Sequence, residues 1–208
     1  MELINKHIEQ YLLESIPERD EILSAMEELG KQNNFPIVGP LVGRLLFQLT
    51  KLTNAKRILE LGSGFGYSAM WFLSALNTEG NIICTDTSSH NHTMAEGFFR
   101  QAKLWHRIDF RIGNALELID KLDGEFDIIF NDIDKADYPE AFRKAIPKLR
   151  KGGLLISDNV LWSGKILDHF PDESTAGVLT YNRLIYTSQE LYTTIIPLRD
   201  GVSVSIKL

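Results

Sequence analysis

Ionisable side chains gather at the end of one apolar run, in the stretch FDIIFNDIDKADY at residues 126–138. A largely apolar segment leads into three carboxylates and an ammonium, among them Asp132 and Lys135. A second apolar run, GGLLIS, leads into Asp158 and Asn159. If the two runs are neighbouring parallel strands, about 4.8 Å apart, their carboxyl ends meet at one edge of a sheet. Two carboxylates and an amide oxygen are ligands that suit Mg²⁺ or Mn²⁺ better than zinc.

Lys135 follows Asp132 by three residues, which makes its amine a candidate proton acceptor for a hydroxyl held beside the metal. The competing interpretation is a helix-capping loop with solvated charges. We favour a functional site for the set as a whole, because clustered ionisable groups mark such sites. Asp134 and Asp137 are interpreted as orienting Lys135 or capping the next helix.

A glycine loop, ELGSGFG at residues 60–66, follows an earlier apolar run. Its spacing is G-x-G-x-G and differs from the dinucleotide pattern G-x-G-x-x-G, and Glu60 precedes the first glycine. A carboxylate there is a poor neighbour for pyrophosphate and a good one for an ammonium group. S-adenosylmethionine carries an ammonium, and also a carboxylate that suits helix N–H groups. Asp86 ends the next apolar run, where an acid can hold ribose hydroxyls. The loop therefore predicts a nucleoside-cofactor site.

The order of the elements predicts an α/β fold. Apolar positions at helical spacing predict helices in residues 1–53, with a break near Pro36 and Pro40. From Arg57 strands alternate with helices, which argues for a parallel sheet covered on both faces. The expected strands span 57–61, 81–86, 108–113, 126–132 and 152–159, and the expected helices 67–76, 92–104, 115–122 and 138–149. Two strand-like runs around Asp200-Gly201 predict an antiparallel hairpin at one edge. We expect a single domain, 1–208, with a helical cap (1–53) and an α/β core (54–208).

Composition restricts the classes of protein that fit this chain of 208 residues. The N-terminus lacks the pattern of a signal peptide, no apolar run reaches the length of a membrane span, and a single cysteine, Cys84, suits a reducing compartment. These features predict a cytoplasmic protein without a membrane partner. A formal net charge of −6 gives no general attraction to nucleic acid and leaves room for a local basic patch.

The motifs NDIDKADY, SDNVLWSG and ELGSGFGYS together resemble the cation-dependent O-methyltransferase family, which includes catechol and caffeoyl-coenzyme A O-methyltransferases. The similarity runs from about Pro36 to the C-terminus. The resemblance implies the class I S-adenosylmethionine-dependent methyltransferase fold, which is Rossmann-like. That fold has a seven-stranded, mostly parallel sheet with one antiparallel strand and helices on both faces. The resemblance also implies a homodimer.

The resemblance assigns a role to each site residue. Lys135 would be the catalytic base, and Asp132 would take part in catalysis while contacting both the metal and the cofactor. The ligands of Mg²⁺ (or Mn²⁺ or Ca²⁺) would be Asp132, Asp158 and Asn159. Contacts to S-adenosylmethionine would come from Val38, Glu60, Gly62, Ser63, Tyr67, Ser68, Asp86, Gly113, Asn114, Ala115 and Asp132.

The acceptor is expected to be a small catechol-like molecule with vicinal hydroxyls. Residues 163–175 are interpreted as a variable lid, and Trp162 as either an aromatic wall beside the metal or a core residue. The alternative acceptor is tRNA carrying 5-hydroxyuridine at the wobble position, with phosphate contacts from Arg44, Lys51, Lys56, Lys165 and Arg183. A third interpretation, from a different class, is a non-catalytic protein that binds S-adenosylmethionine.

Overall fold

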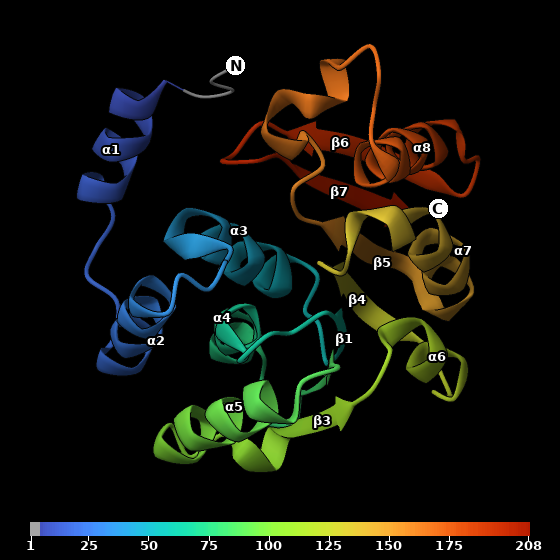
Figure 1. Cartoon of the computed structure of the whole chain (residues 1–208). Helices are drawn as coiled ribbons and strands as arrows, with labels where there is room; N and C mark the ends of the chain where they lie inside the picture. The colour runs from blue at the N-terminus through green and yellow to red at the C-terminus, as the bar shows by residue number, and fades with distance from the viewer. Residues whose placement is uncertain (1–4) are drawn as a thin grey trace.

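Seven strands form one sheet in residues 5–208, the part of the chain that the computed structural model describes (Figure 1). Their order across the sheet is β3-β2-β1-β4-β5-β7-β6. Strands β1 to β5 pair in parallel, and β7 runs antiparallel to both β5 and β6. The strands are β1 Arg57–Leu61, β2 Asn81–Asp86, β3 Ile108–Ile112, β4 Phe126–Asn131, β5 Leu149–Ser157, β6 Leu191–Ile196 and β7 Val202–Lys207. The predicted sheet, with one antiparallel strand and a hairpin at its edge, is confirmed.

Helices cover both faces of this sheet. They are α1 Lys6–Ser15, α2 Glu21–Gln32, α3 Gly39–Leu52, α4 Tyr67–Ala75, α5 Ser89–Gln101, α6 Ala115–Asp120, α7 Tyr138–Lys148 and α8 Glu173–Thr187. Short 3₁₀ turns are η1 Trp105–Arg107, η2 Lys135–Asp137 and η3 Trp162–Leu167. None of the helices in residues 5–208 is long and apolar enough to cross a membrane.

Alternation along the strands divides the core into two halves. On one face Ile58 and Ile82 pack with α2 to α5, and on the other face Leu59 and Ile83 pack with α6 to α8. Strands with both faces buried read as continuous apolar runs, which is the pattern that predicted them. The two layers of helices thus leave the carboxyl edge of the strands as the place where polar side chains meet.

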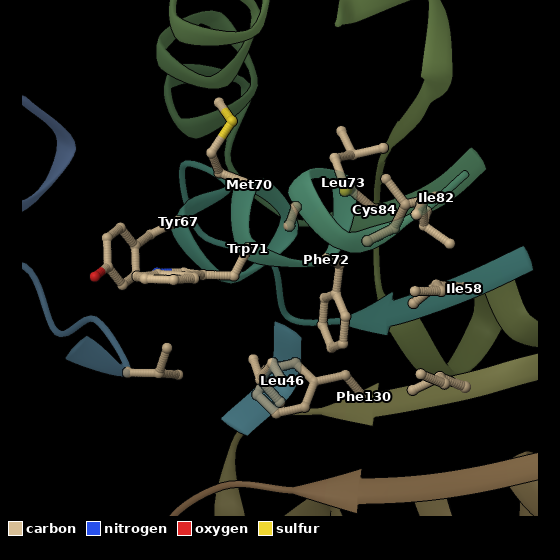
Figure 2. Close-up of a cluster of buried hydrophobic side chains, with 14 of the residues drawn as sticks. Leu46, Ile58, Tyr67, Met70, Trp71, Phe72, Leu73, Ile82, Cys84 and Phe130 are labelled. Atoms are coloured by element: carbon tan, nitrogen blue, oxygen red, sulfur yellow. The ribbon is translucent and has the colours of Figure 1, made fainter. Parts of the chain in front are cut away.

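Helix α4 is buried along nearly its whole length. In Figure 2 the Phe72 side chain points from α4 toward Phe130 of β4, and the two ring centroids lie 5.6 Å apart. Helix α3 approaches α4 closely at Gly43, where a Cβ atom would lie 2.3 Å from the indole of Trp71. This packing fixes the start of α4, and therefore the glycine loop that leads into it.

Helix α8, Glu173–Thr187, is not among the elements that were expected from the sequence. Asp172 caps this helix by accepting from the Thr175 N–H at 2.7 Å, and Val178, Tyr181 and Ile185 are buried at helical spacing. The segment interpreted as a lid, 163–175, is divided between η3, a short loop and the first turn of α8. Pro40 lies in the first turn of α3, where a missing N–H costs nothing, so the expected resumption of the helix is confirmed.

Candidate active site

Asp132 and Asp158 leave adjacent strands at the same level. Strands β4 and β5 pair in a register that sets Asn131 opposite Ser157, so each acid is the first residue beyond its strand. The Asp132 N–H donates to the carbonyl of Leu61 at 2.9 Å, and the Asp158 N–H donates to the carbonyl of Asn131 at 3.2 Å. The backbone hydrogen bonds between the strands thus continue one residue beyond β4 and β5, and they hold both acids side by side.

A cavity of about 1090 Å³ opens at this edge of the sheet. Its volume is slightly above the usual range for small-molecule sites, which leaves room for a cofactor and an acceptor together. The structure brings into its wall nearly all of the sequence-predicted site residues: Val38, Gly62, Ser63, Tyr67, Ser68, Asp86, Gly113, Asn114, Ala115, Asp132, Lys135, Asp158 and Asn159. Glu60 is the predicted site residue that does not line it.

The Lys135 ammonium is enclosed on several sides. Its Nζ donates to Asp132 Oδ1 at 2.8 Å and to the carbonyl of Ile133 at 3.2 Å. The rings of Tyr138 and Trp162 lie with their centroids 4.9 Å and 5.7 Å from Nζ. The side chain is 9% exposed, so its amine faces the cavity and little bulk water.

The Asp158 carboxylate is buried, and its Oδ1 has no hydrogen-bond partner among residues 5–208. Burial, and then the negative charge of Asp132, raise the pKa of Asp158 to about 7. Burial also raises the pKa of Asp132, against the opposing charge of Lys135. An unpartnered buried oxygen beside a second acid is the arrangement that a divalent cation would relieve.

The donor set fits a hard cation and not zinc. No group of three or more His, Cys, Asp or Glu side chains able to hold a metal occurs in the described chain. The predicted set has only two carboxylates, and its third donor is the amide of Asn159. That residue has a left-handed backbone with φ 54°. Oxygen donors of this kind suit Mg²⁺ or Mn²⁺.

The glycine loop passes directly beneath the acids. Gly62 has φ 82°, and a Cβ atom there would lie 2.5 Å from the carbonyl oxygen of Asp132. The Gly64 N–H donates to Asp86 Oδ2 at 3.0 Å, while Asp86 Oδ1 accepts from the Ser88 N–H at 2.8 Å. The loop, Asp132 and Asp86 are therefore one connected unit, in which only glycine fits at position 62.

Glu60 lies behind the cavity wall, fully buried. Its Oε1 accepts from the hydroxyl of Ser68, and its Oε2 lies 3.6 Å from the thiol of Cys84, which donates to it. Burial raises the pKa of Glu60 to about 7. Ser68 does line the cavity, so in this structure Glu60 reaches the cofactor region through that hydroxyl.

Glu60→Gln is expected to change how stability depends on pH in the cofactor-free protein. Because the folded-state pKa is raised, the wild-type protein loses stability as pH rises from about 4.5 through about 7. Glutamine carries no charge and removes this loss. The free energy of unfolding of the variant, relative to wild type, should gain up to about 3 kcal/mol between pH 4.5 and 8, measured by urea denaturation. Parallel pH curves for the two proteins would contradict this account, and the exposed Glu79→Gln is the matched control.

Tyr138 is a site residue that the sequence reasoning missed. Its hydroxyl donates to the carbonyl of Asp158 at 2.9 Å, and the carbonyl of Asn131 lies 3.4 Å away. It therefore joins the ends of the two strands that carry the acids. The signal was present in DKADY, because a tyrosine three residues beyond Lys135 begins a helix that packs under the same edge.

Tyr138→Phe should weaken metal binding by about tenfold, because it releases the Asp158 backbone while keeping the ring near Lys135. Binding of S-adenosylhomocysteine should change little, since Tyr138 lies outside the glycine loop. Calorimetric titration with Mn²⁺ and with S-adenosylhomocysteine would measure both, and the exposed Tyr192→Phe serves as control. Equal losses of both affinities would show that Tyr138 acts only through general stability.

The remaining predicted residues separate into two groups. Trp162 lines the cavity, and its indole N–H is buried without a partner in the described residues, which favours the aromatic-wall interpretation over a core residue. The basic residues proposed for tRNA do not line the cavity: Arg44, Lys51, Lys56, Lys165 and Arg183. Lys56 precedes β1, so it lies at the opposite edge of the sheet from Asp132.

Comparisons with known proteins agree with the geometry. The sequence model of the O-methyltransferase family matches residues 14–208. Catechol O-methyltransferase of Niastella koreensis is 32% identical over 200 residues, covering 91% of this chain and 90% of that protein. The solved O-methyltransferase of Bacillus cereus, in complex with SAH, superposes with a TM-score of 0.89 at 26% identity, covering 97% of each chain. TomG of Streptomyces achromogenes, in complex with SAM, gives 0.89 at 27% identity and covers 97% and 96%.

The resemblance inferred from the three motifs is thus confirmed at the level of the family. The order of the strands agrees with the fold it implied. The chain therefore belongs to the O-methyltransferase family and has the class I fold of S-adenosylmethionine-dependent methyltransferases.

Proposed function

We propose that this enzyme transfers the methyl group of S-adenosylmethionine to one hydroxyl of a vicinal-dihydroxy, catechol-like small molecule, with a divalent cation at the acceptor side. The observation that supports this most strongly is the wall of one cavity. The acids Asp132 and Asp158 and the amine of Lys135 face the same space as the glycine loop. A site for a cationic methyl donor and a site for an oxygen acceptor would therefore be adjacent.

The cofactor side would be formed by the glycine loop, Asp86 and the 113–115 turn. Asp86 can accept from ribose hydroxyls, because a carboxylate has more acceptor positions than its present donors occupy. Asn114 caps α6, accepting from the Leu116 N–H at 2.8 Å, which holds this turn against the cavity. The SAH and SAM in the two related structures support the same choice of cofactor.

Asp132, Asp158 and Asn159 would hold the metal. A bound divalent cation would orient two vicinal acceptor oxygens and lower the pKa of one hydroxyl. The unpartnered Oδ1 of Asp158 supports this assignment. The repulsion between the buried carboxylate of Asp158 and the partly buried carboxylate of Asp132 supports it as well.

Lys135, as the neutral amine, would accept the proton of the acceptor hydroxyl at Nζ. The oxygen lone pair then forms a bond to the methyl carbon while the carbon–sulfur bond breaks. Its electron pair stays on sulfur, which leaves neutral S-adenosylhomocysteine and a protonated lysine. The rings of Tyr138 and Trp162 exclude water around Nζ, and the shared cavity wall aligns the two reactants.

An acceptor panel tests the vicinal requirement. Release of S-adenosylhomocysteine is expected with catechol, and little is expected with phenol or resorcinol, which lack a second adjacent oxygen. Equal turnover of phenol would contradict a two-oxygen acceptor site. tRNA that carries unmethylated 5-hydroxyuridine belongs in the same panel, and turnover of that RNA alone would move the function to RNA modification.

Two other interpretations are weaker on the geometry. The basic residues proposed for tRNA contact do not line the cavity, although the Lys165 ammonium lies 5.4 Å from the ring of Trp162. They come from α3, α8, η3 and the residue before β1, and so do not form one continuous element. A silent binding protein would have no need for a buried lysine bonded to one acid of a metal set. The homodimer and the cytoplasmic location stay predictions from the resemblance and the composition.

A further inference from the structure

Arg199 is a cation in the cavity wall that the proposed chemistry does not use. It lies in the loop between β6 and β7 and lines the same cavity as Asp132 and Asp158. Its backbone is left-handed, with φ 50°, which is uncommon for a residue other than glycine. The following residues tie this loop to the end of β5, since Leu161 N–H donates to the Asp200 carbonyl at 2.9 Å. The unusual backbone is thus held in place by the fold.

The guanidinium has capacity for another partner. Its Nη1 donates to the carbonyl of Ile37 at 2.8 Å, and its Nε lies 3.9 Å from Glu9 Oε1. It also rests on Gly39, where a Cβ atom would lie 3.0 Å from Nη1. Nη2 has no hydrogen bond to the residues from 5 to 208, and the side chain is 38% exposed.

Glu9 is a weak competitor for this charge. It belongs to α1, a helix with no buried residues, which stands apart from the sheet in Figure 1. At 3.9 Å the pair lies at the limit of a salt bridge, and exposed pairs of this kind contribute little. A closer anion could therefore replace Glu9 at little cost.

The positive charges in the cavity wall indicate where an anionic group of a ligand could bind. Three cations line the cavity: Lys31, Lys135 and Arg199. Lys135 donates to Asp132, and Lys31 lies on α2. The loop that carries Arg199 is tied to the residues directly after Asp158 and Asn159, since the Val160 N–H donates to the carbonyl of Gly201 at 3.0 Å. Arg199 therefore lies at the end of the cavity where the acceptor would bind.

We propose that Arg199 binds a carboxylate on the acceptor, so that the preferred substrates are catechols with an acidic side chain. This inference rests on the proposed function and names its substrate class. A planar guanidinium fork matches a carboxylate and remains charged at all working pH values. A neutral catechol would leave this donor without its partner and bind less tightly.

The test compares wild type with Arg199→Gln on three acceptors of similar size: 3,4-dihydroxybenzoate, 4-methylcatechol and 3,4-dihydroxybenzylamine. Wild type is expected to prefer the benzoate over the neutral catechol by about tenfold or more in kcat/KM, mainly through KM. Arg199→Gln should lower that ratio by about tenfold to 100-fold. Arg199→Glu should reverse the preference in favour of the amine. The control is Arg143→Gln on α7, an exposed arginine paired with Glu140 outside the cavity, which should keep the wild-type ratio.

The ratio of kcat/KM for the benzoate to kcat/KM for the neutral catechol separates carboxylate binding from a purely structural role of Arg199. Loss of a structural contact would lower turnover of all three acceptors together and leave the ratio unchanged. Unchanged ratios with active catechol turnover would overturn this inference and leave the proposed function standing. The same holds if wild type shows no preference, a result that needs no variant to fold. Failure of wild type on every catechol would overturn the proposed function itself, and this inference with it.

Discussion

Lys135→Ala is expected to lower kcat for methyl transfer by about 10³-fold, within the range that general bases contribute. The amine is the proton acceptor in the proposed reaction, and no second lysine among residues 5–208 shares the acceptor end of the cavity. Affinity for S-adenosylhomocysteine should stay close to wild type, because Lys135 points at Asp132 and not at the glycine loop. Steady-state kinetics and calorimetric titration measure the two quantities.

Lys135→Met separates proton transfer from packing, since it keeps the aliphatic stem between Tyr138 and Trp162. It should lose as much activity as the alanine variant. The exposed Lys151→Ala is the matched control and should behave as wild type. Turnover by Lys135→Met within about threefold of wild type would show that Lys135 is not the base.

Asp158→Asn is expected to have the second large effect, a loss of activity of about 10³-fold with a loss of stabilisation by Mg²⁺. One of the two carboxylates that would hold the metal becomes neutral, so affinity for a hard cation falls steeply. The metal-free variant should be at least as stable as wild type, because the substitution removes the repulsion between partly buried Asp132 and buried Asp158. Activity and stability therefore move in opposite directions.

Thermal unfolding with and without Mg²⁺ measures this effect apart from turnover. Wild type should show a higher Tm when Mg²⁺ is added, and Asp158→Asn should show no rise. The exposed Asp123→Asn keeps both cavity acids and should respond as wild type does. A normal rise in Tm for Asp158→Asn would remove Asp158 from the metal set.

The sequence was sufficient for the sheet and for the acids at its edge. Apolar runs buried on both faces predict parallel strands, and parallel strands bring their carboxyl ends to one edge, so Asp132 and Asp158 had to lie close together. The pairing of Asn131 with Ser157 shows the reason at the level of single residues. The need for glycine at position 62 could also be predicted, because a strand-to-helix turn beside a ligand requires a positive φ and a close approach of the backbone.

The orientation of the Glu60 side chain could not be predicted from the motif alone. Glu60 lies two residues after Ile58, so its side chain points to the same face of the sheet, the face covered by α4. It pairs in register with Cys84. Strand alternation applied to RILEL would have directed its side chain under Ser68 rather than into the cavity. The motif indicated a carboxylate near the cofactor, and the strand period decides which way it points.

Arg199 and helix α8 were not predicted from the sequence, for different reasons. Arg199 meets the carbonyl of Ile37, 162 positions away, through a hairpin loop whose path no local pattern encodes. Helix α8 did carry a signal in Asp172 and the spacing of Val178, Tyr181 and Ile185. The expected elements included no helix at these residues.

The measurement that tests the central claim most directly is release of S-adenosylhomocysteine by the purified protein, given S-adenosylmethionine and catechol, with and without EDTA. We predict turnover that EDTA lowers by about 100-fold or more and that excess Mg²⁺ restores, because the acceptor site needs its cation. Turnover of catechol that is indifferent to EDTA would contradict the assignment of Asp132, Asp158 and Asn159 as metal ligands.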